Sequence, residues 1–193
     1  MCYSDDLPGA VSEFKRSAVE HGCTPLQHEL LCRLVVEAEK GPTGQALLQE
    51  TIKTGQQVHK IPNTHIALIV ALAETGQEKQ LRRLLMDPSV KINSSLLLAR
   101  CQRLVDEDKL EPLQAIVSST YNNANFNNTP IFTYMLQIFN RRGDCDGALS
   151  LWTSMQERDV QPPPQFLDQL AVATAQPQAS CAFRHFCRPQ SPV

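Results

Sequence analysis

Apolar residues recur along this chain with the spacing of an α-helix. Several segments carry apolar side chains at positions i, i+3, i+4 and i+7, which lie on one face of a helix. The clearest stripes are Leu31, Leu34, Val35 and Ala38; Ile66, Ile69, Val70 and Ala73; and Ile131, Tyr134, Met135 and Ile138. The alternating β-branched and aromatic runs of half-buried strands are almost absent from the sequence. The pattern therefore predicts an all-α protein.

Each of these stripes belongs to the first helix of a pair of helices. Second stripes lie at Leu47, Leu48 and Ile52; Leu81, Leu84 and Leu85; Leu110, Leu113 and Val117; and Ala148, Leu151, Trp152 and Met155. Turn residues separate the two members of each pair, at Gly41-Pro42, Gly76, Asp106–Asp108 and Gly143. The turns recur roughly every 31 to 36 residues, which is typical of an α-solenoid built from helix pairs. An irregular helical bundle is the alternative.

The turn residues and helix breakers also set the expected boundaries of the domain and of its helix pairs. We expect a helical-repeat domain over 9–175 with flanking half-pairs, and a single tryptophan, Trp152, buried inside the last full pair. The expected pairs span about 26–58, 63–87, 94–121 and 129–158. Residues 1–8 are expected to form a disordered start. Residues 176–193 are rich in Pro and Gln without helical spacing and are expected to form a disordered tail.

One unit matches a known motif. The segment from Thr129 to Pro163 resembles the pentatricopeptide repeat, a unit of about 35 residues. The resemblance lies in Tyr134, Leu136, Gly143, Ala148-Leu149, Leu151-Trp152, Met155 and the exit Asp159-Val160-Gln161-Pro162. A tetratricopeptide repeat, the nearest competitor, is one residue shorter and lacks the Val-x-Pro ending. The fold implied is a right-handed α-solenoid of pentatricopeptide-like helix pairs.

The order of landmarks from Phe14 to Ala171 resembles an internal stretch of the leucine-rich pentatricopeptide-repeat family of mitochondrial proteins. Besides the unit above, Pro25–Val36 and Ile69–Gly76 carry this resemblance. It implies a non-catalytic scaffold that binds single-stranded mitochondrial mRNA with a small RRM-type protein and supports mRNA stability, polyadenylation and translation. Because the family is much longer, the chain is expected to be a fragment or a truncated form.

The same resemblance implies candidate RNA contacts. In this family, one first-helix side chain and one side chain at the repeat end read each base, and these positions match Thr133 and Pro163. Pro163 has no side-chain donor or acceptor, so half of the base-reading pair is missing. The matching first-helix positions of the earlier units fall near Leu31, Ile66 and Leu97, which cannot hydrogen-bond a base and are expected to pack in the core.

Contact with the RNA backbone requires cations. Arg141 and Arg142 end the first helix of the recognisable unit and are the candidate phosphate contacts. Two further arginine pairs are Arg100 with Arg103, and Arg82 with Arg83. The formal net charge is -2 at pH 7, so the chain has no global attraction for a polyanion. A solvated charged face remains the alternative for these arginines.

Metal and enzyme chemistry have little support in the sequence. His21, Cys23, His28 and Cys32 lie close together, and so do Cys181, His185 and Cys187, but neither group has paired C-x2-C spacing. Cys32 falls within an apolar stripe, where a free cysteine packs as a small hydrophobic residue. We expect no metal, no cofactor, no small-molecule substrate and no catalytic residues.

Localisation follows from the resemblance rather than from a signal. The first residues include Asp5 and Asp6 where a mitochondrial presequence carries Arg or Lys, so no presequence is predicted in the chain. The family implies the mitochondrial matrix, whereas a chain complete as written would be cytosolic or nuclear. No stretch reaches about 18 consecutive apolar residues, so no membrane association is expected. The alternative function is a protein–protein adaptor whose groove binds a peptide or a helix.

Overall fold

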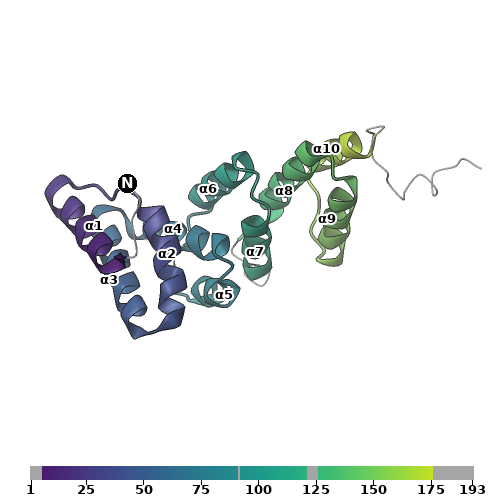
Figure 1. Ribbon diagram of the computed structural model, residues 1–193. Helices are drawn as coiled ribbons and strands as arrows, with labels where there is room; N and C mark the ends of the chain where they lie inside the picture. The colour runs from purple at the N-terminus through teal and green to yellow at the C-terminus, as the bar shows by residue number, and fades with distance from the viewer. Residues whose placement is uncertain (1–5, 91, 121–125, 176–193) are drawn as a thin grey trace, which may run out of the picture.

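The computed structural model describes residues 6–90, 92–120 and 126–175, and within these ranges every regular element is a helix. The helices follow one another in a row from α1 at one end to α10 at the other (Figure 1). They are α1 (Leu7–His21), α2 (Gln27–Lys40), α3 (Pro42–Val58), α4 (Ile61–Glu74), α5 (Glu78–Met86), α6 (Ser94–Asp106), α7 (Glu111–Thr120), α8 (Thr129–Arg142), α9 (Cys145–Glu157) and α10 (Pro164–Ala175). The all-α prediction is confirmed.

The first helices of successive pairs form the spine of the solenoid. Short turns join α2 to α3, α4 to α5, α6 to α7 and α8 to α9. The first helix of each pair packs on the first helix of the next, from α2 through α4, α6 and α8 to α10. Helix α1 packs on α3 and so occupies the place of a second helix. Stacking of this kind buries the apolar stripe that a single pair would leave in water.

The second helices stack less regularly than the first. Helix α1 packs on α3 and α5 packs on α7, whereas among the described residues the backbones of α3 and α5 do not come close, nor do those of α7 and α9. Helix α4 packs against both α5 and α7, so it connects the second helices of two consecutive pairs. The continuous line of helix contacts therefore runs along the first helices.

Residues in the left-handed backbone conformation follow several first helices and allow the chain to reverse direction. Gly76 and Gly143 have φ angles of 70° and 66°, and Asp108 adopts the same conformation with φ 57° in the third pair. The N–H of Lys109 then donates to the carbonyl oxygen of Leu104 at 2.8 Å, which is the 6→1 hydrogen bond of a Schellman turn. Aspartate tolerates this region better than most residues, so the third turn forms without glycine.

The first helix starts earlier than the sequence predicts. The carboxylate of Asp6 accepts a hydrogen bond from the N–H of Gly9 at 2.9 Å, and Pro8 lies in the first turn of α1. Both features favour a helix start at Leu7. The expected disordered start is therefore wrong for residues 6–8. Its remainder, 1–5, and the expected tail, 176–193, lie outside the described residues.

The core is one continuous apolar cluster that runs from α2 to α10, with a smaller cluster between α1 and α2. Trp152 is only partly buried and packs against the edge of the main cluster, contrary to the expectation. The stripe of α9 that faces the core is formed by Ala148, Leu151 and Met155, which occupy the buried positions. None of the described helices is long and apolar enough to cross a membrane.

Candidate nucleic-acid interface

A groove of about 710 Å³ lies along the first helices of three consecutive pairs. The loop before α2 and the start of α2 form one wall, α4 contributes Ala67 and Val70, and the end of α6 forms the other wall. Its charged and ionisable lining residues are His28, His59, Glu74, Arg100, Arg103, Glu107 and Lys109. The groove therefore combines an apolar strip from α4 with polar groups at its rims.

Arg100 and Arg103 are the cations best placed for an external anion. They lie three residues apart on α6, where Leu97 and Cys101 are buried in the core, and both line the groove. Neither guanidinium forms an ion pair or side-chain hydrogen bond within the described part of the chain. Both arginines are therefore available to a ligand in the groove.

The acids of the groove are already engaged. Glu74, at the end of α4, pairs with His28 through one carboxylate oxygen and with Lys109 at 2.6 Å through the other. Lys109 also pairs with Glu107 at 2.6 Å. Glu74 is thus bound by a histidine and a lysine, and Glu107 is held by the same lysine.

These contacts shift the protonation of the groups in a consistent direction. Hydrogen bonds with Cys32 and Glu74 raise the pKa of His28 to about 9. The hydrogen bond from His28, with a further contribution from Lys109, lowers the pKa of Glu74 to about 2. Glu107 and Glu74 together raise the pKa of Lys109. At neutral pH the ionised forms of all three residues are favoured.

The expected base-reading positions are not displayed to a ligand. Thr133 is 9% exposed, and its hydroxyl donates to the carbonyl oxygen of Thr129 at 3.4 Å. Helices α6, α7, α9 and α10 all pack against α8. Leu31, Ile66 and Leu97 are fully buried, as expected for packing residues. The structure thus gives Thr133 a packing position rather than that of an exposed base contact.

The other predicted contacts have different surroundings. The guanidinium of Arg142 donates to Asp108 twice, from Nε to Oδ2 at 2.9 Å and from Nη2 to the carbonyl oxygen at 2.6 Å. It therefore ties the end of α8 to the turn before Lys109. Arg141 is exposed beside it, with no ion pair among the described residues. Pro163 is partly buried, and its carbonyl oxygen accepts the N–H of Phe166 at 2.9 Å at the start of α10.

Part of this interface has no clear signal in the sequence. Arg100 and Arg103 stand out as a pair of cations, but His28 and Lys109 belong to different repeat units and lie far apart in the chain. The stacking of α2, α4 and α6 brings them to one groove. A repeat-by-repeat comparison cannot find such a group, because each unit contributes a different type of residue.

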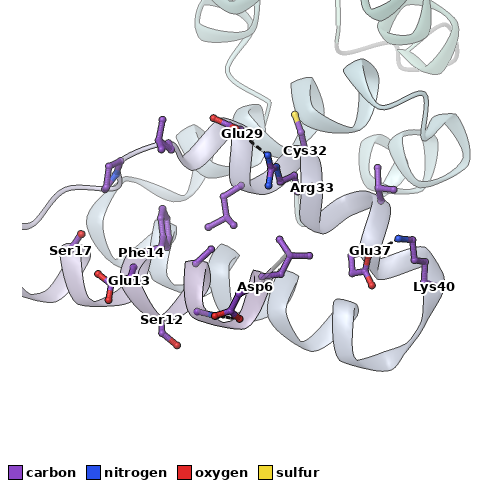
Figure 2. A pocket seen from close by; sticks show the side chains of 17 residues that line it. Asp6, Ser12, Glu13, Phe14, Ser17, Glu29, Cys32, Arg33, Glu37 and Lys40 are labelled. Carbon is purple, nitrogen blue, oxygen red and sulfur yellow. Dashed lines mark hydrogen bonds and ion pairs between the residues drawn. The ribbon is translucent and has the colours of Figure 1, made fainter. Parts of the chain in front are cut away.

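A second groove, of about 1190 Å³, lies between α1 and α2 (Figure 2). Two ion pairs on α2 border it, Arg33 with Glu29 at 3.6 Å and Lys40 with Glu37 at 2.8 Å. Among its apolar lining residues, Leu26 is 53% and Val36 is 41% exposed. This groove is shaped by neighbouring helices and has charged rims and an apolar interior.

Helix pairs stacked through their first helices define an α-helical repeat protein, and comparison with known proteins narrows the class. The chain is 28% identical over 166 residues to the leucine-rich PPR motif-containing protein, mitochondrial, of Xenopus tropicalis. It is 25% identical to the proteins of the same name from Rattus norvegicus and Mus musculus, over 167 and 166 residues. The expected resemblance to leucine-rich pentatricopeptide-repeat proteins is confirmed over most of the chain.

The matches cover most of this chain but only a small part of each relative. They cover 86% of this chain but only 12% of the length of each relative. The chain therefore spans about an eighth of the curated relatives that it matches. No protein-family model and no solved structure matches the chain.

Proposed function

We propose that this chain is a non-catalytic, RNA-associated helical-repeat scaffold that holds single-stranded RNA along the groove of α2, α4 and α6. The observation that carries the proposal is the pair Arg100 and Arg103, which line this groove without an acidic partner among the described residues. The kinship with pentatricopeptide-repeat proteins supports it. By resemblance, the role is to support stability, polyadenylation and translation of mitochondrial mRNA in the matrix, together with a small RRM-type protein.

The proposed contacts are to phosphates and not to base edges. Arginine recognises phosphate oxygens through several fixed donors, and such contacts position a nucleic acid without reading its sequence. The first-helix positions that the motif assigns to base reading are buried in all four units, from Leu31 in the first to Thr133 in the fourth. Binding by this chain should therefore be salt-dependent and nearly indifferent to sequence. Arg141, exposed at the end of α8, is a further proposed phosphate contact.

Replacing both Arg100 and Arg103 with alanine should weaken binding to unrelated single-stranded RNAs by a similar factor. Each lost phosphate contact lowers the slope of log affinity against log salt by about 0.7, so the double variant should lose about 1.4 of slope. Fluorescence-anisotropy titrations at several salt concentrations measure both quantities. Arg141→Ala, measured in parallel, should lower the slope by about 0.7.

The matched control is the double variant Arg82→Ala and Arg83→Ala. These arginines are exposed on α5, a second helix, and do not line the groove. The control has the same net charge as the groove variant, so it separates a local contact from general electrostatic attraction. Equal losses in the two double variants, or strong selectivity among RNAs, would contradict the proposed contacts.

A protein–protein adaptor is the second candidate function, and the groove between α1 and α2 favours it. Leu26 and Val36 offer apolar surface there, and the charged pairs at the rim would face the polar side of an amphipathic helix. An RNA surface gains affinity steeply at low salt, whereas an apolar groove does not. Failure of the chain to bind any RNA at low salt would therefore favour the adaptor.

A further inference from the structure

Three side chains with metal-ligand chemistry meet beside the candidate RNA groove, and two of them, His28 and Glu74, line it. The Sγ atom of Cys32 lies 3.7 Å from Nε2 of His28 and 4.0 Å from Oε2 of Glu74. Nε2 of His28 is in direct hydrogen-bond contact with the same oxygen of Glu74. The three donor atoms thus all lie within 4.8 Å of one another.

The fold positions these donors through backbone elements that are already packed. His28 and Cys32 lie four residues apart on α2, so they occupy one face of the helix in successive turns. Glu74 ends α4, which packs directly against α2. Lys109 holds the other carboxylate oxygen of Glu74 at 2.6 Å. Oε2 is thereby left facing His28 and Cys32.

We propose that His28, Cys32 and Glu74 form a zinc-binding site. In tetrahedral zinc sites the metal lies about 2.3 Å from sulfur and about 2.0–2.2 Å from nitrogen or oxygen, so neighbouring donors are about 3.3–3.6 Å apart. The two separations that involve Cys32 are close to these values. The ion would replace the direct contact between His28 and Glu74, so those two side chains would move apart to make room for it.

The donor set selects the kind of metal. An imidazole, a thiolate and one carboxylate suit a borderline-soft ion such as Zn²⁺, whereas Mg²⁺ and Ca²⁺ prefer oxygen ligands throughout. On binding, the thiol of Cys32 and the imidazolium of His28 release their protons to solvent, and the ion accepts an electron pair from each. His28 and Glu74 also line the groove, so the fourth position opens toward it and takes a water molecule.

Spectroscopy with Co²⁺ as a probe for Zn²⁺ tests the site. The purified chain, kept reduced with a phosphine, should bind one Co²⁺ with a thiolate-to-metal absorption band and the visible bands of a tetrahedral ion. Zn²⁺ should displace it. Cys32→Ser should abolish the thiolate band, and His28→Gln and Glu74→Gln should each weaken binding at least about tenfold.

Cys23→Ser is the matched control, because Cys23 is exposed and lines the same groove but lies outside the cluster. It should bind Co²⁺ like the unaltered chain. Circular dichroism of each variant checks that the helices persist. If Glu74→Gln disturbs the fold, the near-isosteric Cys32→Ser still tests the site through the loss of the thiolate band. Absence of tetrahedral Co²⁺ bands, or their persistence in Cys32→Ser, would overturn the proposal and leave the cluster as an ion-pair network.

Discussion

Gly44→Ala should destabilise the protein by about 3 kcal/mol, although alanine usually favours a helix over glycine by about 1 kcal/mol. Gly44 is buried in the first turn of α3, where the backbone of α3 approaches the last turn of α2. A Cβ atom there would lie 2.8 Å from the backbone nitrogen of Ala38 and nearer still to the carbonyl group of Glu37. Backbone atoms cannot move aside as a side chain can, so the two helices would have to separate.

Urea unfolding followed by circular dichroism measures the effect. Gly41→Ala is the matched control, because no atom lies within 4 Å of a Cβ at this position and its φ of 168° is extended backbone. We expect the control to change the free energy of unfolding by less than about 0.5 kcal/mol. An unchanged or raised stability of Gly44→Ala would show that α2 and α3 do not approach as closely as described.

Phe166→Ala should lower the stability by about 3–5 kcal/mol, as truncation of a buried phenylalanine does. Phe166 is fully buried and belongs to the main apolar cluster, and α10 packs against both α8 and α9. Because repeat proteins are stabilised mainly by contacts between neighbours, much of this loss should be concentrated at α10. Loss of α10 packing would also uncover part of α8.

Hydrogen exchange resolves where the loss occurs. In Phe166→Ala, the amides of α10 and the adjoining face of α8 should lose protection before those of α2 to α4. Leu167→Ala is the neighbouring control, since Leu167 is 46% exposed and its truncation should cost well below about 1 kcal/mol. Similar costs for the two substitutions would mean that α10 is not anchored through Phe166.

Much of this architecture could be predicted from local signals. The apolar stripes identify first helices such as α4, whose Ile66 and Ile69 are fully buried, and Gly76 and Gly143 mark turns that need a left-handed residue. Both signals lie within one repeat and act over a few residues. The partial burial of Trp152 is harder to predict. Consecutive residues of a helix point about 100° apart, so Leu151 of α9 is buried while the next residue, Trp152, is only partly buried.

The groove depends on contacts that no single repeat contains. Thr133 matches a base-reading position of the motif, yet it is buried, and α8 packs against helices of neighbouring units as well as against its own partner α9. Cys32 and Glu74 are 42 residues apart in the chain, so the spacing of histidines and cysteines around His28 gave no sign of a carboxylate beside them. Long-range packing therefore accounts for what the pattern missed.

The uneven stacking of the second helices has a mechanical consequence. Because α3 and α5, like α7 and α9, make no close backbone contact within the described residues, two joints along the solenoid are held by the α2–α4 and α6–α8 contacts and by those of α3 with α4 and α7 with α8. Bending at such a joint would pivot about the α2–α4 and α6–α8 contacts while the opposite side opens or closes. Such bending would change the distance between α2 and α6 and with it the width of the groove that they line.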